Sequence, residues 1–217
     1  MAKSTGDPHG DAVRAELDDI AAHELVVRFA ATLAVRPGRE IESAPPQRRA
    51  AILLVVRLRA DGDPELLMIK RAEFEGDPWS GHIACPGGRM EPGDHDLEQT
   101  AVRETWEETG IDIRRDGRVL GHLDDLQPRT PSLPPLVIRP YVALVRRDVE
   151  ITPSLEVASA FWVPVTALRE RSAWGIGAVQ TRAGERHVST FQHGEHTVWG
   201  LTERVLRQFL DYLGVPR

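Results

Sequence analysis

The stretch Gly87–Ile111 reads GGRMEPGDHDLEQTAVRETWEETGI, and it decides how the rest of the chain is interpreted. Near its end, Glu104 is followed three and four residues later by Glu107 and Glu108. On a helix, residues at these spacings project from one face, where like charges repel by roughly a few tenths of a kcal/mol per pair. The cluster therefore predicts a cation that offsets the repulsion, and converging carboxylate oxygens suit Mg²⁺ or Mn²⁺.

The residues around this cluster predict a helix with defined ends. Asp96 is a typical N-cap residue, and Gln99 three positions later completes a capping box. Gly110 suits the left-handed backbone conformation that ends many helices. Proline and glycine at 86–88 predict a turn before the helix. A solvated acidic helix face is the alternative interpretation, but the glycine turn, Arg103 and the defined helix end together favour the ion site.

The whole stretch resembles the signature of the Nudix hydrolases, G-x5-E-x7-R-E-U-x-E-E-x-G-U, in which U is aliphatic. The matching positions are Gly88, Arg103, Glu104, Glu107, Glu108, Gly110 and Ile111. Three features depart from the signature. Asp94 replaces the first glutamate, eight residues rather than seven separate it from the arginine, and Thr105 stands where an aliphatic residue is usual. The longer spacer is similar to the coenzyme A pyrophosphatase branch of the family.

The similarity to that branch covers about residues 50–213, including the strand pattern Phe161–Pro164. One motif of the branch, L-R-x-H-x-G-Q, is incomplete. In the matching stretch 76–82, Gly81 fits, His82 replaces the glutamine and the Arg-x-His part is missing. The resemblance implies hydrolysis of a nucleoside diphosphate linked to another group, with coenzyme A, ADP-ribose-type compounds and dinucleoside polyphosphates as candidates in that order.

The metal ligands that we predict are glutamates of the helix. Mg²⁺ keeps several waters and takes few protein carboxylates. Glu104 and Glu108 therefore suffice as its direct ligands, and Glu107 is a third ligand or the ligand of a second ion. The turn before the helix adds a backbone carbonyl, for which Gly88 is the candidate.

The catalytic residues follow from the resemblance and from side-chain chemistry. Arg103 has a rigid guanidinium that can hold a carboxylate in position, and Asp94 or Glu107 is its expected partner. The resemblance implies a glutamate as the base that activates water. Glu107 and Glu156 are the candidates, although an exposed structural carboxylate is the alternative interpretation of Glu156.

Four residues outside the glutamate cluster are candidates for substrate binding. Arg71 and Arg89 flank the signature and suit phosphate. Trp79, in a glycine- and proline-containing loop, suits stacking on a base, and His82 can hydrogen-bond a ligand. A surface or packing role is the alternative for each of them. Trp106 lies one position off the carboxylate face, so we expect it to pack in the core.

Composition limits the remaining possibilities. The chain has 217 residues and a net charge of −6, which argues against broad binding to nucleic acid. No apolar run is long enough to span a membrane, and the N-terminal sequence does not resemble a signal peptide, so we expect a cytoplasmic location without a membrane partner. The single cysteine, Cys85, excludes an intrachain disulfide, and its apolar surroundings predict a buried strand end rather than a nucleophile.

Hydrophobic periodicity predicts an α/β fold. Helices are expected at 11–35, broken near His23, at the Nudix helix, at 165–171 and at 201–213. Strands are expected at 51–56, 66–69, 83–85, 117–126, 136–145, 156–163, 179–190 and 196–199. The resemblance implies the particular form, a Nudix α/β/α sandwich with a mixed central sheet.

The predicted organisation has three parts. Residues 1–10 form a disordered tail, 11–50 an N-terminal helical extension and linker, and 51–217 the Nudix hydrolase domain. The partner is a small-molecule nucleotide, and analogy with relatives leaves open a homodimer through the N-terminal helix. Two other functions stay open, a pyrophosphatase that removes unwanted nucleoside triphosphates and a non-catalytic nucleotide sensor. The intact set of glutamates disfavours the sensor.

Overall fold

The computed structural model describes residues 8–42, 48–75, 79–128, 135–181 and 184–214. A seven-stranded sheet occupies the centre of these residues. Its strands are β1 (Arg48–Leu58), β2 (Pro64–Arg71), β3 (Ile83–Ala84), β4 (Gly87–Arg89), β5 (Gly117–His122), β6 (Leu136–Val145) and β7 (Val157–Pro164).

The sheet is mixed, as predicted. Strands β1 and β6 run parallel, whereas β2 and β4 are antiparallel to β1, β3 and β7 to β2, and β5 to β6. Strand β4 pairs Gly88 with Ala51 and Gly87 with Ile52, so the glycine turn is held against the first half of β1. This register places the turn of the signature at the centre of the sheet.

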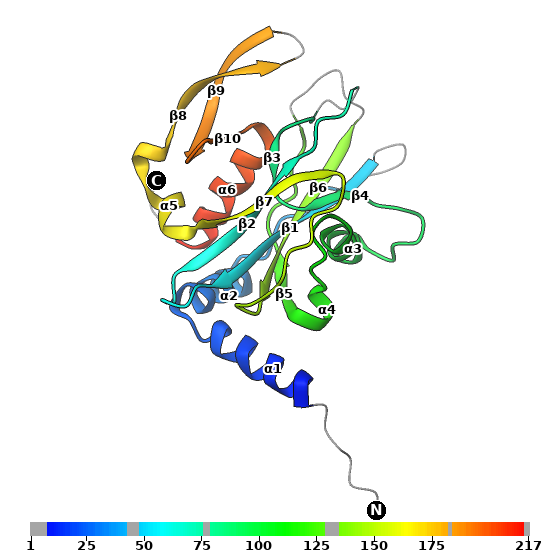
Figure 1. Cartoon of the computed structure of the whole chain (residues 1–217), viewed down its shortest axis with the longest axis vertical. Coiled ribbons are helices and arrows are strands. Elements are labelled where there is room, and N and C mark those ends of the chain that lie inside the picture. The colour runs from blue at the N-terminus through cyan, green and yellow to red at the C-terminus, as the bar shows by residue number, and fades with distance from the viewer. Residues whose placement is uncertain (1–7, 43–47, 76–78, 129–134, 182–183, 215–217) are drawn as a thin grey trace, which may run out of the picture.

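Each face of the sheet carries its own hydrophobic core. Leu54 and Val56 of β1 pack into one core with residues of α1 (Pro8–Ala21), α2 (Glu24–Val35) and α6 (Gly200–Tyr212). The alternate residues Leu53 and Val55 pack into the other, which contains α3 (Leu97–Thr109) and α4 (Ile113–Asp116). Figure 1 shows α2 and α3 on opposite sides of the central strands. The predicted α/β/α sandwich is therefore confirmed. Within the described ranges, no helix is long and apolar enough to cross a membrane.

A second, three-stranded sheet follows the short helices α5 (Val165–Arg169) and η1 (Arg171–Ala173). It consists of β8 (Trp174–Thr181), β9 (Gly184–His193) and β10 (His196–Trp199). The prediction of one strand over 179–190 was wrong, because the chain reverses between Thr181 and Gly184. Gly184 has a φ of 98°, which favours glycine, and the Thr181 hydroxyl donates to its carbonyl. The hydrophobic periodicity over 179–190 gave no signal for this turn.

The N-terminal helices are separated where the sequence predicts a break. Helix α1 ends at Ala21 and α2 begins at Glu24, with His23 as N-cap accepting a hydrogen bond from the Leu25 N–H. Helix α1 begins at Pro8, earlier than predicted, and the rest of the predicted tail lies outside the described residues. Part of the predicted linker, 43–47, also lies outside them, and β1 begins at Arg48. The division into three parts stays a prediction.

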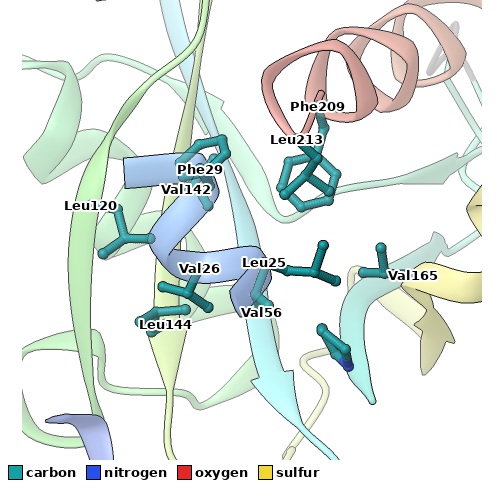
Figure 2. Close-up of a pocket in the computed structure, with 11 residues that line it drawn as sticks. Leu25, Val26, Phe29, Val56, Leu120, Val142, Leu144, Val165, Phe209 and Leu213 are labelled. Atoms are coloured by element: carbon teal, nitrogen blue, oxygen red, sulfur yellow. The ribbon is translucent and has the colours of Figure 1, made fainter. Parts of the chain in front are cut away.

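Helix α2 is closely packed against the C-terminal helix. The Phe29 ring is 2% exposed, and its centroid lies 5.9 Å from that of Phe209 and 6.1 Å from that of Tyr212. Beside these rings lies an apolar cavity of roughly 20 Å³, which Figure 2 shows between α2, α6 and the sheet. Its apolar lining and its volume, about that of one water, identify a packing gap rather than a ligand site.

We expect Phe29→Ala to lower the free energy of unfolding by about 3–5 kcal/mol, because it empties a buried aromatic site between α2 and α6. Chemical denaturation followed by circular dichroism measures the change. The matched control is Val35→Ala, at a residue 85% exposed on the same helix, which should change stability by less than about 0.5 kcal/mol. A loss below about 1 kcal/mol for Phe29→Ala would mean that α2 is a detachable extension.

Candidate active site

Helix α3 has the ends that the sequence predicts. The Asp96 carboxylate accepts from the Gln99 N–H at 2.8 Å, as predicted for the N-cap. The Gln99 amide oxygen accepts from the His95 N–H at 2.9 Å, one residue before the N–H that the predicted capping box would use. Gly110 has a φ of 74°, and its N–H donates to the Trp106 carbonyl. Residue 105 is tolerated as threonine because its buried hydroxyl donates to the Ala101 carbonyl one turn earlier, at 2.7 Å.

Arg103 joins this helix to the loop before it. Its Nε and Nη2 donate to the two oxygens of Asp94, at 3.0 and 2.9 Å. Its Nη1 donates to Glu107 at 2.9 Å and to Glu104 at 3.1 Å. The hydrogen bonds from Arg103 hold the pKa of Asp94 well below its usual range, although burial opposes them. Asp94 also accepts from the Thr100 hydroxyl, a contact for which the sequence gives no signal. Both expected partners of Arg103 are therefore bound.

Glu108 is the buried carboxylate of the cluster. It is 3% exposed, and it accepts from the Gly87 N–H at 2.8 Å and from Nη1 of Arg71 at 3.4 Å. Burial raises the pKa of Glu108 to about 7, and the charges of Glu104 and Glu156 push it in the same direction. The hydrogen bond from Gly87 and the charge of Arg71 oppose the rise. Glu108 thus lies where negative charge is costly.

The Glu104 carboxylate lies directly over Gly88. A Cβ added at Gly88 would overlap the carboxylate carbon and both carboxylate oxygens. Burial also raises the pKa of Glu104. The structure therefore gives Gly88 a steric role, which is to leave room for Glu104, while its predicted role as a carbonyl ligand stays a prediction.

The third glutamate is more exposed. The Glu107 side chain is 47% exposed and is held by Arg103. Its neighbour Trp106 is 58% exposed, so the prediction that Trp106 packs in the core was wrong. Residues Leu97, Ala101 and Thr105 already occupy the face of α3 that meets the sheet.

The substrate-binding candidates divide into residues near the cluster and one residue apart from it. Arg71 contacts Glu108 directly, and its N–H donates to the His82 carbonyl at 3.0 Å. The His82 ring packs against Trp199 with centroids 4.5 Å apart, and the His82 N–H donates to the Trp79 carbonyl. Nothing in the local sequence indicated the contact with Trp199, because strand β10 arrives from far along the chain. Residues 76–78 of the same loop lie outside the described residues.

Arg89 is the candidate whose side chain lies away from the glutamate cluster. It pairs in register with Ala50, whereas the neighbouring Gly88 pairs with Ala51. Because adjacent strand residues point to opposite faces, Arg89 points away from the face of the sheet on which Glu104 lies. Its carbonyl, not its side chain, meets the site by accepting from Arg103 at 3.1 Å.

Glu156 lies at the edge of the cluster. It directly precedes β7, and its carbonyl accepts from the Ala72 N–H at 2.8 Å. Its side chain is exposed, yet its charge reaches Glu108 and raises the pKa of that carboxyl. Strand pairing between β2 and β7 thus brings residues 71 and 156 close together.

The donor chemistry of the site fits a hard divalent ion. Glu104 and Glu108 supply carboxylate oxygens at a place where burial and like charge disfavour ionisation, which a cation would relieve. No group of three acidic, histidine or cysteine side chains among the described residues is arranged to enclose a metal, and Arg103 holds Glu107. Two carboxylates agree with the preference of Mg²⁺ for few protein ligands and several waters.

Comparison with known proteins identifies the family. Residues 47–181, more than half of the chain, match the model of the NUDIX domain. The chain therefore belongs to the Nudix hydrolase family, and it is a Nudix pyrophosphohydrolase acting on a nucleotide-type small molecule.

Two relatives have a stated activity. The mouse mitochondrial coenzyme A diphosphatase NUDT8 is 31% identical over 207 residues, which cover 94% of this chain and 90% of that protein. The peroxisomal coenzyme A diphosphatase ndx-8 of Caenorhabditis elegans is 34% identical over 122 residues, covering 54% of this chain and 50% of that protein. The chain also spans 45% of an uncharacterized Schizosaccharomyces pombe protein, with 33% identity.

A solved structure supports the fold. The MutT/nudix family protein from Enterococcus faecalis aligns with a TM-score of 0.50 and 16% identity, covering 91% of this chain and 79% of that chain. Because two relatives are named for the mitochondrion and the peroxisome, the cytoplasmic location stays a prediction.

We expect Gly88→Ala to lower Mg²⁺-dependent pyrophosphate hydrolysis by about 100-fold or more, because the added methyl group displaces Glu104. Steady-state kinetics and thermal unfolding, measured together, separate displacement from misfolding. The matched control is Gly93→Ala in the same loop, where a Cβ would meet no atom within 4 Å and activity should persist. Wild-type turnover in Gly88→Ala would show that the position of Glu104 is unimportant.

The pKa of Glu108 predicts a pH-dependent stability. Burial raises it to about 7, above the roughly 4.3 of an unfolded glutamate, so the folded state favours the protonated form. The stability that this contributes is fully present below about pH 4.3 and is lost as the pH rises through about 7. In a chelating buffer, we expect the free energy of unfolding to fall by up to about 3 kcal/mol over this range.

Urea denaturation at several pH values tests this expectation. Glu108→Gln should remove most of the fall, whereas Glu98→Gln, at an exposed carboxylate on the same helix, should keep it. An equal fall in the Glu108→Gln protein would assign the pH dependence to another group.

Proposed function

We propose that this chain is a metal-dependent pyrophosphohydrolase that cleaves a nucleoside diphosphate linked to another group, with coenzyme A as the first candidate substrate. The observation that carries the proposal is a pair of carboxylates over the Gly87–Gly88 turn, the buried Glu108 and the partly buried Glu104, with Arg71 alongside. The names of the mouse and nematode relatives support coenzyme A. The incomplete motif at 76–82 keeps ADP-ribose-type compounds and dinucleoside polyphosphates as the next candidates.

The residues divide the chemistry among them. Glu104 and Glu108 would hold a Mg²⁺ or Mn²⁺ ion, and Glu107 would add a third oxygen on leaving Arg103. When bound, the ion would supply neutralisation of pyrophosphate charge and activation of a water. Arg71, whose guanidinium lies beside Glu108, binds a phosphate oxygen and orients the phosphorus toward the water. The water oxygen bonds to one phosphorus as the bridging P–O bond of the anhydride breaks, and each of the two products leaves with a terminal phosphate.

Glu156 is the better candidate for the base. Arg103 holds the Glu107 carboxylate in an ion pair at 2.9 Å, so Glu107 already has a positioning role between the helix and the loop. Glu156 is exposed, and its charge is close enough to affect Glu108. In this role Glu156 takes the proton of the attacking water, which leaves the oxygen free to bond to phosphorus. Removal of Glu156 should therefore lower kcat more than it raises KM.

The deciding experiment is hydrolysis of a nucleotide panel with Mg²⁺ or Mn²⁺. Coenzyme A, ADP-ribose, a dinucleoside tetraphosphate and a nucleoside triphosphate are compared by kcat/KM, with products separated by chromatography. We expect coenzyme A to be cleaved best, and Glu108→Gln to lower kcat by about 10²–10³-fold. A loss of turnover in Glu108→Gln would also show that the hydrolysis comes from this chain and not from a contaminating enzyme.

Other outcomes would support the alternatives. Preference for the nucleoside triphosphate would indicate a clean-up pyrophosphatase. Tight nucleotide binding without turnover of any member of the panel would indicate a sensor, although the intact carboxylate set disfavours it.

A further inference from the structure

Strand β8 is one of the two outer strands of the three-stranded sheet, and β10 is the other. The strand order is β10, β9, β8, and the ladder joins β8 to β9 alone among the described strands. Figure 1 shows the β8–β9 hairpin projecting away from the central sheet. An outer strand of this kind presents backbone N–H and C=O groups on its free side, which can pair with another strand.

The sequence of β8 lacks the features that normally prevent such pairing. Residues Gly175–Gln180 read GIGAVQ, with no charge and no proline. Gly175, Ile176, Ala178 and Gln180 are exposed, and Ile176 is 69% exposed. The neighbouring strand β9 carries its charges, including Glu185 and Arg186, on the other side of the hairpin. The uncharged stretch therefore lies on the open side.

Strands β5 and β7, two outer strands of the central sheet, are protected. Strand β5 is interrupted by an irregularity between Val119 and Gly121, and its Arg118 binds Asp18 of α1 at 3.1 Å. Strand β7 ends in Pro164, and its Phe161 ring stacks on His196 of β10 with centroids 3.9 Å apart. Bulges, charges, proline and covering elements are the usual means of closing an edge. Residues 175–180 have none of them.

We propose that β8 pairs with β8 of a second copy of this chain, forming a six-stranded sheet across a two-fold axis. Antiparallel pairing is symmetric, so one surface serves both subunits. Residues that face one another across a symmetric antiparallel pair point to the same face of the sheet, so a two-fold axis sets one residue opposite its own copy. With the axis at Ala178, Ile176 lies opposite Gln180 of the second copy. No charge meets a like charge in this register, and the two glycines leave room for the facing side chains.

This surface is a better site for self-association than the N-terminal helix. Val13, Leu17 and Ile20 of α1 are already buried in the core of their own chain. The β8 contact involves few residues, so its buried area falls below that of a standard stable interface of about 1,600 Å². The dimer is therefore weak, with a dissociation constant in the micromolar to millimolar range, and independent of the pyrophosphohydrolase chemistry.

Sedimentation equilibrium of the full chain from about 1 μM to about 1 mM tests the pairing. Wild type should self-associate, and Ile176→Lys should weaken the association about tenfold or more by putting a charge on the open strand. The matched control is Val35→Lys, which adds the same charge at another exposed apolar residue and should leave the association unchanged.

Hydrogen exchange of the wild-type protein gives a second measurement that needs no variant. Amides of residues 175–180 should exchange more slowly at high than at low concentration, while amides of α1 and β7 should not change. The proposal is overturned by a monomer throughout the range, by association that Ile176→Lys leaves intact or that Val35→Lys weakens equally, or by protection confined to other elements.

Discussion

The ion pair between Arg103 and Asp94 is the interaction on which the glutamate site depends. The guanidinium binds both oxygens of Asp94 and still reaches Glu104 and Glu107 with its remaining nitrogen. It therefore fixes the glycine loop to the helix that carries the glutamates. The guanidinium makes all these contacts at once because it is planar, permanently charged and carries several N–H donors. The single ammonium group of a lysine could not replace it. Because Asp94 is 8% exposed, losing its partner would leave a poorly solvated charge.

The two departures at this position compensate for one another. Aspartate is one methylene shorter than glutamate, and here the spacer to the arginine is one residue longer. The loop turns between residues 91 and 94, where the Asp94 N–H donates to the Glu91 carbonyl and the Glu91 N–H donates to the Asp94 carboxylate. This turn presents the shorter side chain to the arginine. Around it, four carboxylates face the guanidinium groups of Arg71 and Arg103, which leaves the site with an excess of negative charge.

Local signals explain which features were predictable from the sequence. Asp96, Gln99 and Gly110 act on backbone groups within a few residues, so the ends of α3 could be predicted. The direction of Arg89 depends on the register between β4 and β1, and the exposure of Trp106 depends on which face of α3 meets the sheet. The packing of His82, the residue before β3, on Trp199 of β10 joins residues distant in sequence. None of these three features has a local signal.

Asp124 connects three parts of the chain that are made at very different times during synthesis. Its carboxylate accepts from the backbone N–H and side chain of Arg39, 85 residues earlier, and from the Tyr212 hydroxyl, 88 residues later. Contacts of such long sequence separation form late, because the intervening chain must be ordered first. The segment after α2 therefore has no complete anchor until α6 has left the ribosome. A nascent chain that stops short of Tyr212 leaves the apolar faces of α2 and the sheet uncovered, which makes this interval the one in which the protein most needs protection from aggregation.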